Sequence, residues 1–460
     1  MQNDLTVVIL AAGMGTRMKS ALPKVLHEAG GMPIVEHVVQ SAGEKAPFEK
    51  VVVVTGHGAA QVEEHLAQYP VRFVRQTEQN GTGHALMVAG EQVPGKEGLL
   101  VVLYGDCPLL SAETIGRLLE QHAASGTAAT VITAVLDDPT GYGRMILDEG
   151  GNCLAIVEQK AATPEQLAIR EINSGIYCFD AALLWRHLAE ITPNAASGEI
   201  YLTDMVEILR GHGHRVKTLR VPDAAEILGI NTRVELAQAD RYLRDRKAKQ
   251  LMLDGVTIER PETVTIDKFV EIGPDTVVEA FVHLRGRTRI GRDCAIGTGS
   301  VLQNAVIGDD VWIHPYCIIV DSVLESRAQV GPFARLRMQA TVGENAQVGN
   351  FVELKKTHLG AGAKAMHLAY LGDSQIGEKV NIGAGTITCN YDGVNKHATV
   401  IGAGAFVGSN STLVAPVEIG AGAYVGAGSV ITDGVPPETL ALGRARQVVK
   451  TDWQRRPKKT

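Results

Sequence analysis

Two basic residues and a loop of small residues near the amino terminus could together bind an anion. Arg17 and Lys24 follow the segment 11–15, which contains two alanines and two glycines. Small residues let a backbone approach a ligand closely, and their N–H groups can point at phosphate oxygens. A helix beginning after the loop would add the positive end of its dipole. The alternative is a plain tight turn, since Met18 occupies the third glycine position of the dinucleotide fingerprint.

Asp106 is a candidate ligand for a divalent cation. It follows the apolar run Leu99–Leu103, and open α/β sheets bind ligands at the carboxyl ends of their strands. Mg²⁺ prefers one or two carboxylates together with substrate phosphate oxygens and water. The alternative is an aspartate that caps a helix or closes a turn. We predict a magnesium site at Asp106.

His367 is a candidate general base in the second half of the chain. An imidazole has an unperturbed pKa near 6.5, which suits it to take a proton from an amine at neutral pH. Lys355 and Arg335 or Arg337 could bind a phosphate, and further polar side chains follow at Tyr370 and Asn390. A single histidine in a loop is more often merely solvated, so the prediction depends on the whole group of residues.

The first half of the chain alternates between short apolar runs and helical patterns. Strands are expected at 7–10, 51–54, 72–74, 99–103 and 154–157, and helices at 34–42 and 61–66. Such alternation is typical of βαβ units and a parallel sheet. We predict a Rossmann-like α/β domain.

Three sequence strings in this domain resemble the motifs of a known enzyme family. The string L-A-A-G-x-G-T-R-M followed by P-K resembles the signature of sugar-nucleotide pyrophosphorylases, which join a nucleoside triphosphate to a sugar 1-phosphate. Q-x-x-Q-x-G-T-G-H-A resembles the uracil-reading segment of the uridylyl-transferring members, and Y-G-D-x-P-L supports the metal ligand. In this chemistry a sugar phosphate oxygen attacks the α-phosphorus and pyrophosphate leaves. It needs positioning and charge neutralisation rather than a protein nucleophile.

The resemblance implies a set of site residues. It implies Arg17 and Lys24 as catalytic cations, sugar contacts at Gly143, Glu158 and Asn173, and metal ligands at Asp106 and Asn231. The nucleotide and sugar would be bound by Leu10, Ala11, Ala12, Gly13, Lys24, Gln76, Gly81, Thr82, Tyr104, Gly105, Asp106, Gly143, Glu158, Asn173 and Asn231.

The second half has a period of six. Aliphatic residues recur at positions 272, 278, 284, 290, 296 and 302, and again at 401, 407, 413, 419, 425 and 431. This period predicts a parallel β-helix with the aliphatic side chains stacked inside. Resemblance to hexapeptide acyltransferases implies left-handed coils and assembly as a trimer. The repeat is expected to be interrupted at 349–375 and 383–400, where His367 and its polar neighbours lie.

The block G-N-F-V-E-x-K-K, H-L-x-Y-L-G-D and N-I-G-A-G-T-I-T-C-N-Y-D-G closely resembles one family. These are the bacterial bifunctional N-acetylglucosamine-1-phosphate uridylyltransferase / glucosamine-1-phosphate N-acetyltransferases, and the resemblance covers essentially the whole chain. It implies His367 as the base on the glucosamine amine. It implies acceptor contacts at Arg337, Lys355, Tyr370 and Asn381, and acetyl-CoA contacts at Ala384, Asn390, Tyr391, Ser409, Ala427 and Arg444. Met338-Gln339 replaces an expected Pro-Gly, which puts the turn that holds Arg337 in doubt.

The resemblance implies two consecutive reactions. The carboxyl-terminal site acetylates glucosamine 1-phosphate with acetyl-CoA, and the amino-terminal site then transfers uridylyl from UTP with Mg²⁺. The product would be UDP-N-acetylglucosamine, a precursor of peptidoglycan and lipopolysaccharide. We predict a uridylyltransferase domain at 1–232, a charged linker helix at 233–254 and an acetyltransferase β-helix at 255–460.

Composition excludes several other classes. The net charge of −7 is spread along the chain, which argues against nucleic-acid binding. We expect no membrane span and no signal peptide, because long apolar runs are missing. Six scattered cysteines without a C-x-x-C pair suit reduced thiols in a cytoplasm. The basic segment 455–459 is expected to be a solvated end.

Two other interpretations stay open from the sequence. The chain could be a single-activity pyrophosphorylase whose β-helix only assembles subunits or binds a regulator. It could also be a non-enzymatic scaffold that uses the β-helix to bind partners. The first predicts a coil surface without the cluster of His367, Lys355, Tyr370 and Asn390, and the second predicts loss of Lys24, Asp106 or His367. The sequence has all of these residues.

Overall fold

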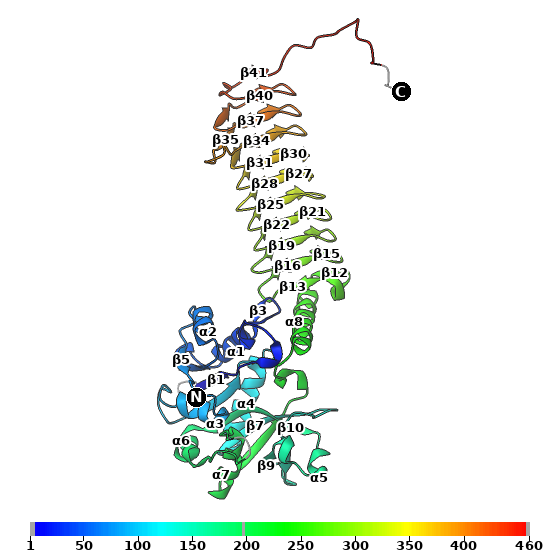
Figure 1. The fold of residues 1–460 in the computed structure, drawn as a ribbon. Coiled ribbons are helices and arrows are strands. Elements are labelled where there is room, and N and C mark those ends of the chain that lie inside the picture. Colours follow the sequence, from blue (N-terminus) through cyan, green and yellow to red (C-terminus); the bar gives the residue numbers. More distant parts are fainter. Residues whose placement is uncertain (1–4, 196–197, 457–460) are drawn as a thin grey trace. The chain divides into compact units, whose positions relative to one another are not determined.

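A computed structural model describes residues 5–195 and 198–456. Its contacts divide the chain into two compact units, Met1–Leu243 and Arg244–Thr460. Within the described residues, the helices are all too short or too polar to cross a membrane. Figure 1 shows a mixed α/β unit and a stack of short strands, and we describe each by itself.

The first unit is built on a twisted sheet with the strand order β11-β7-β10-β6-β1-β4-β5. The central strand β1 is buried along its whole length and pairs in parallel with β4 and β6. The bounds of the strands are β1 (Leu5–Ala11), β4 (Val51–Thr55), β5 (Arg72–Arg75), β6 (Leu99–Tyr104), β7 (Ala129–Val135), β8 (Arg144–Leu147), β9 (Cys153–Val157), β10 (Glu171–Asp180) and β11 (Val216–Arg220).

Helices cover both faces of this sheet, as burial of parallel strands requires. One face packs against α1 (Ile34–Gly43), α2 (Ala59–Leu66) and α4 (Ala112–Ser125). The other packs against α3 (Thr82–Ala89), α6 (Ala181–His187) and α7 (Met205–Gly211). The short helix α5 (Pro164–Leu167) begins with a capping box at Thr163. The predicted Rossmann-like class is confirmed.

Two local expectations for this unit are wrong. The sheet is mixed, because β10 runs antiparallel to both β6 and β7. The connection from β7 to β10, residues 136–170, forms the antiparallel pair β8 and β9, and β10 then pairs antiparallel with both β8 and β7. No α-helix follows the first loop directly, since residues 12–33 form the 3₁₀ turns Thr16–Met18 and Lys24–Leu26 and the short strands β2 (Glu28–Ala29) and β3 (Met32–Pro33) before α1 begins. Helix-dipole stabilisation of an anion is therefore not available there.

The charged segment forms α8 (Arg233–Leu253), at the predicted place. Its start is fixed by a reciprocal cap: the backbone N–H of Thr232 donates to Glu235 Oε2 at 2.7 Å, and the N–H of Glu235 donates to Thr232 Oγ1 at 3.3 Å. Ala239 and Leu251 of the predicted apolar stripe are buried. The assignment of one activity to each side of this helix stays a prediction.

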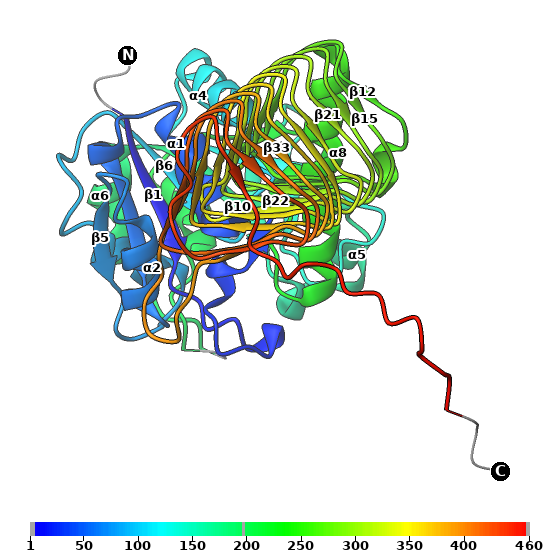
Figure 2. The same ribbon diagram turned by 90° about the horizontal axis from the view of Figure 1, so that it is seen from above.

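The second unit is a three-sided parallel β-helix, and Figure 2 looks down its coils. One side runs from β12 (Thr257–Ile258) to β41 (Leu440–Ala441), the second from β13 (Thr265–Ile266) to β40 (Val430–Ile431), and the third from β14 (Glu271–Ile272) to β38 (Val417–Ile419). The aliphatic residues of the six-residue repeat form its core, with Ile272 partly buried. Each buried side chain contributes roughly 1.5–3 kcal/mol. The predicted left-handed β-helix class agrees with this architecture.

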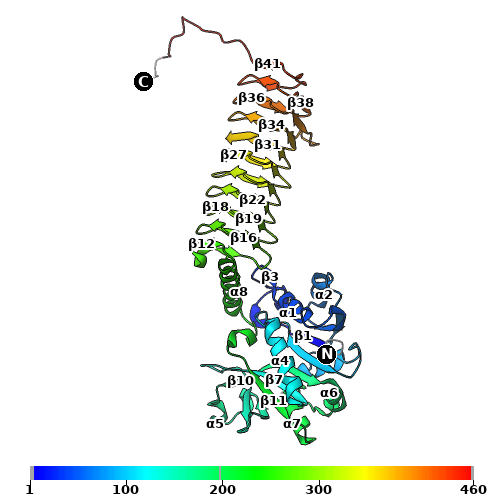
Figure 3. The ribbon, with the colours of Figure 1, turned by 180° about the vertical axis from the view of Figure 1, so that it is seen from behind.

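One expected interruption of the repeat does not occur. Residues 349–375 continue the coils through β28 (Glu353–Lys355), β29 (His358–Leu359), β30 (Lys364–His367) and β31 (Tyr370–Gly372). Figure 1 labels β28, β30 and β31 within the stack, and Figure 3 shows β31 from behind. Leu354, Leu359, Ala365 and Leu371 fill the interior there. The six-residue period does not reveal these coils, because the steps from Leu354 to Leu359 and from Leu371 to Ile376 are five residues long and Ala365 is small. Residues 390–398 do leave the coil, between β34 (Ile387–Cys389) and β35 (Thr399–Ile401).

This packing predicts the effect of Leu354→Ala. The side chain is fully buried inside the prism, so its truncation should lower the free energy of unfolding by about 2–5 kcal/mol. Leu368→Ala is the matched control, because Leu368 is 62% exposed. This substitution should change the free energy of unfolding by less than about 0.5 kcal/mol. Guanidinium unfolding measures both. Equal effects would contradict the buried ladder.

Candidate functional site

Lys24, Asp106 and Asn231 meet in the first unit although they are far apart in sequence. Lys24 Nζ lies 2.5 Å from Asp106 Oδ2 and 3.2 Å from Asn231 Oδ1. Asp106 follows β6, and Asn231 directly precedes the capped start of α8. The side chains of Lys24 and Asp106 are only 11% and 17% exposed, so their charges act on each other with little screening by water.

The close approach of Lys24 depends on a neighbouring glycine. Gly15 has φ +60°, and a Cβ at this residue would lie 2.5 Å from Lys24 Cβ. Any larger residue would therefore displace the lysine stem as well as strain the backbone. The sequence pattern selected Gly15 as a phosphate-loop glycine, and the structure gives it this second, steric reason.

Lys24 and Asp106 open into a cavity of about 310 Å³. Most of the residues predicted to bind the nucleotide line it: Leu10, Ala11, Ala12, Gly13, Lys24, Gln76, Gly81, Thr82, Tyr104 and Asp106. Gly105 lies just beneath, where its N–H donates to Leu10 O at 2.9 Å. The loop, α3 and the end of β6 thus enclose one small-molecule site.

The amide of Gln76 is held in place on one wall of this cavity. Its nitrogen lies 3.2 Å from Gly81 O and 3.0 Å from His84 Nδ1. Gly81 precedes α3 with φ +100°, and Ile200 O would lie 2.4 Å from a Cβ there. The backbone N–H of Gly83 donates to Ile200 O at 2.8 Å, which ties the start of α3 to the segment before the 3₁₀ turn Leu202–Asp204.

A second cavity of about 240 Å³ shares Tyr104 and Asp106 with the first. Arg17, Tyr142 and Asn231 line it. Arg17 therefore lines a different cavity from Gln76, Gly81 and Thr82. Burial raises the pKa of the Tyr142 hydroxyl to about 12, so this tyrosine is neutral at physiological pH.

The three predicted sugar contacts lie together beside these cavities. A Cβ on Gly143 would be 3.6 Å from Glu158 Oε1 and 3.8 Å from Asn173 Cβ. Asn173 Oδ1 accepts from Gly175 N at 2.9 Å and from the Tyr177 hydroxyl at 3.2 Å. Burial raises the pKa of the Glu158 carboxyl, and the charge of Asp204 raises it further.

Gln79, the second glutamine of the Q-x-x-Q string, lines the first cavity, and its amide donates to Ala12 O at 2.8 Å. Two glutamates of this site were missed by sequence reasoning. Glu199 lines the same cavity, and Glu235 lines the second while accepting the N–H of Asn231 at 2.6 Å. The T-x-x-E spacing of a capping box could have identified Glu235. Glu199 belongs to no motif that we considered.

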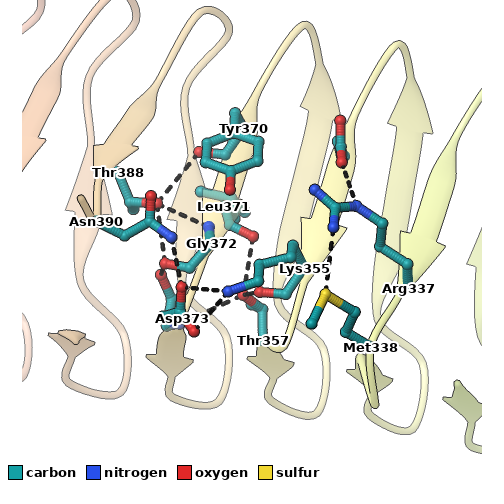
Figure 4. A network of polar contacts seen from close by, with 12 residues as sticks. Arg337, Met338, Lys355, Thr357, Tyr370, Leu371, Gly372, Asp373, Thr388 and Asn390 are labelled. Atoms are coloured by element: carbon teal, nitrogen blue, oxygen red, sulfur yellow. Dashed lines mark hydrogen bonds and ion pairs between the residues drawn. The ribbon is translucent and has the colours of Figure 1, made fainter. Parts of the chain in front are cut away.

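In the second unit a buried lysine is the centre of a polar network, shown in Figure 4. Lys355 Nζ lies 2.9 and 2.7 Å from the two carboxylate oxygens of Asp373, and the Asn390 amide also donates to Asp373. Lys355 is 3% exposed. Burial alone would raise the pKa of Asp373, but the hydrogen bonds from Lys355 and Asn390 outweigh it and lower the pKa.

Gly372 lets the other polar side chains reach this network. A Cβ on Gly372 would lie 2.6 Å from the Tyr370 hydroxyl and 2.7 Å from Asn390 Nδ2. Its N–H donates to Thr388 Oγ1 at 2.8 Å, which fixes the end of β31 against β34. Tyr370, Lys355 and Asn390, predicted from different coils, therefore lie at one place.

His367 lies at the end of β30, exposed, with its ring nitrogen Nδ1 2.7 Å from Asn350 Oδ1. Asn350 pairs with His367 in neighbouring coils. Sequence reasoning did not select Asn350, although the 17-residue offset between the two coils could have pointed to it. A hydrogen bond at Nδ1 orients the ring and leaves Nε2 to face a ligand.

Arg337 is held by Glu353, with Nε 2.7 Å from Oε1. Its Nη1 lies 3.3 Å from the sulfur of Met338. Met338 and Gln339 both have positive φ, 56° and 63°. A proline at position 338 could not adopt that φ, so this corner has a different turn from the one that Pro-Gly would make.

The predicted acetyl-CoA residues are only partly brought together. Ala384 O accepts from Asn410 N at 2.7 Å, and Ser409 O accepts from Gly428 N at 2.8 Å, so Ala384, Ser409 and Ala427 form a ladder along one corner.

The remaining predicted residues of this unit lie elsewhere. Asn381, predicted as an acceptor contact, pairs with Lys364 of the previous coil. Tyr391 and Arg444 lie exposed, in the 390–398 loop and after β41. The basic segment 455–459, expected to be a solvated end, includes residues 457–459, which lie outside the described residues.

One further residue beside Lys355 was missed. Lys396 lies in the 390–398 loop, close enough to Lys355 that the positive charge of Lys355 lowers the pKa of Lys396. Two ammonium groups at one point favour an anion. The sequence did not single out Lys396 because it lies outside the repeat and belongs to no motif.

The two units thus have the features of a nucleotidyltransferase and of a hexapeptide-repeat acyltransferase. Residues 7–167 match the model of the MobA-like NTP transferase domain, and residues 269–304 and 398–433 match the bacterial transferase hexapeptide model. Both domain classes are those predicted from the sequence.

Full-length relatives give the family. Three are named bifunctional protein GlmU: from Solibacter usitatus, 55% identical over 100% of this chain and 98% of its own; from Koribacter versatilis, 49% over 97% and 96%; and from Anaeromyxobacter sp., 50% over 99% and 93%. The chain therefore belongs to the bifunctional GlmU family. The family and enzyme class predicted from the sequence, a bifunctional transferase of UDP-N-acetylglucosamine synthesis, are confirmed.

Proposed function

We propose that the first unit transfers uridylyl from UTP to N-acetylglucosamine 1-phosphate at the cavity beside Lys24 and Asp106. The contact of Lys24 with Asp106 and Asn231 carries this proposal. Arg17 and Lys24 neutralise the charge that develops on the phosphates, from the two cavities that share Asp106. Gln76, Gly81 and Thr82 bind the uracil, and Gly143, Glu158 and Asn173 bind the sugar.

Magnesium fits the donor atoms of this site. Asp106 offers a carboxylate and Asn231 an amide oxygen, both hard oxygen ligands, and both lie within hydrogen-bond reach of one atom, Lys24 Nζ. When bound, Mg²⁺ supplies Lewis-acid polarisation of the phosphate oxygens. The capped start of α8 holds the Asn231 backbone through Glu235, which keeps the amide near Asp106. The sugar phosphate oxygen attacks directly, with no covalent enzyme intermediate.

The substitutions Asp106→Asn and Asn231→Ala test the proposed magnesium ligands. Each removes one proposed oxygen ligand, so uridylyl transfer should fall about 10²-fold or more and the Mg²⁺ concentration for half-maximal rate should rise. Pyrophosphate release at increasing Mg²⁺ measures both. Acetyl transfer by the same preparations is the control and should stay unchanged. A variant with an unaltered Mg²⁺ requirement would contradict the ligand assignment.

We further propose that the second unit acetylates glucosamine 1-phosphate from acetyl-CoA. His367 takes the proton from the sugar amine while the amine nitrogen attacks the thioester carbon, and CoA leaves as its thiol. Asn350 orients the imidazole. Lys355 keeps one of its three N–H donors for the sugar phosphate, because Asp373 accepts two. Arg337, Tyr370 and Asn381 complete the acceptor site.

Acetyl-CoA would run along the corner ladder of Ala384, Ser409 and Ala427, whose small side chains leave room for an extended ligand. Asn390, Tyr391 and Arg444 would contact it from the loop and from the segment after β41. The 390–398 loop is internally tied, since Asp392 accepts from Asn395 N at 2.6 Å and lies 2.7 Å from His397 Nε2. It can therefore present Tyr391 in a defined conformation.

A homotrimer is the assembly that we propose. Tyr316, Phe333 and Phe351 stack along one edge of the prism at centroid separations of 5.4 and 5.3 Å. They are 54%, 48% and 56% exposed, and a neighbouring copy would cover such an apolar stripe. We place the enzyme in the cytoplasm, which suits the free cysteines and the two nucleotide substrates.

The substitution His367→Ala tests the proposed general base. Loss of the general base should lower acetyl transfer about 10²–10⁴-fold and leave uridylyl transfer unchanged, because the variant alters only an exposed side chain of the second unit. Thiol release and pyrophosphate release, measured on one preparation, give the two rates. Retained acetyl transfer would contradict the role of His367, and loss of both activities in a folded protein would contradict two separate sites.

A further inference from the structure

A second group of metal-ligating side chains lies in the first unit, on residues that line neither cavity. His187 is the last residue of α6, Glu190 ends the 3₁₀ turn Leu188–Glu190, and His212 follows α7. Helices α6 and α7 lie beside each other in Figures 1 and 3 and pack on the same face of the sheet. The cluster therefore joins the carboxyl ends of two neighbouring helices.

One carboxylate lies between two imidazoles. Glu190 Oε1 is 2.6 Å from His187 Nδ1, and Glu190 Oε2 is 2.9 Å from His212 Nε2. The ring centroids of the two histidines are 4.0 Å apart. One ligand atom from each of the three residues lies within 4.8 Å of the other two.

The local fold holds this arrangement in place. His187 is 6% exposed, so its ring is fixed by packing. Glu190 comes three residues later and lies on the same side of the chain. Hydrogen bonds from His187 and His212 lower the pKa of Glu190, which keeps the carboxylate ionised. The cluster thus offers two imidazole nitrogens, which can bind a metal when the rings are neutral, and one negatively charged carboxylate.

We propose that His187 Nδ1, Glu190 and His212 Nε2 bind a divalent transition metal of the zinc type, with water in a fourth position. Imidazole and carboxylate are the ligands that Zn²⁺ takes in His₂Glu sites, at about 2.0–2.1 Å. Two ligands of one tetrahedral ion lie about 3.4 Å apart, so small side-chain rotations that lengthen the two Glu190–histidine contacts and bring the two ring nitrogens together would fit the ion. The protons of the two N–H groups leave as the metal enters. The ion fastens α6 to α7.

This ligand set differs from the proposed magnesium site. Asp106 and Asn231 offer only oxygen, which suits a hard cation, whereas two imidazoles favour zinc, cobalt or nickel over Mg²⁺. Metal binding at the cluster therefore persists when Mg²⁺ is in excess, and this separates the two sites in one experiment.

The test is titration of the full-length chain with Zn²⁺ in excess Mg²⁺, by calorimetry, and with Co²⁺, by visible absorption. His212→Ala and Glu190→Gln each remove one ligand, and both side chains are about half exposed, at 45% and 46%, so the fold tolerates them. His65→Ala is the matched control, because His65 Nε2 lies 2.7 Å from Glu36 in a pair with one imidazole only.

Wild type and His65→Ala should bind one equivalent of Zn²⁺ that His212→Ala and Glu190→Gln lose or bind about tenfold or more weakly. The d–d absorption bands of bound four-coordinate Co²⁺ should disappear in the same two variants. Circular dichroism checks that all four proteins are folded. Equal zinc binding and equal cobalt spectra in all four would overturn the proposal and leave a hydrogen-bonded His–Glu–His cluster.

Discussion

Parallel pairing of buried strands is the constraint on which both units depend. A parallel strand needs cover on both faces, and the two units meet this need differently. In the first, helices cover both faces of β1, β4 and β6. In the second, the sheets close on themselves, so that one face of each is the interior of the prism. Polar residues are then displaced to strand ends and corners, which is where both candidate sites lie.

Each site combines an ammonium group with an amide and a carboxylate. Lys24 contacts Asp106 and Asn231, and Lys355 contacts Asp373, which also accepts from Asn390. Such partly buried ions are costly unless their charges are paired. The carboxylate holds each lysine in position. In the function that we propose, both lysines would then bind a phosphate group, and His367 would be the added base at the site where a proton must be removed from an amine.

Much of this could be predicted from the sequence, because burial leaves a regular pattern. The run 7–10 and the six-residue ladder gave the two fold classes, and the motif strings gave most of the cavity lining. The direction of β10 could not be predicted, because antiparallel and parallel strands have similar apolar patterns. The coils at 349–375 were missed because their spacing departs from six.

Partners of the site residues were harder to predict than the residues themselves. Asn350 reaches His367 only because two coils stack in register, and Glu235 reaches Asn231 through the first turn of a helix. Lys396 comes close to Lys355 from an inserted loop. Contacts of this kind depend on three-dimensional register, which a single sequence does not reveal without knowledge of the coil length.

The most direct test of the two-site account is release of CoA thiol from acetyl-CoA and glucosamine 1-phosphate, with UTP omitted. The account predicts steady turnover, because the acetyl-transfer site is complete without the nucleotide. No turnover, from a preparation that still forms UDP-N-acetylglucosamine from UTP and N-acetylglucosamine 1-phosphate, would contradict it and leave the β-helix with a role in assembly alone.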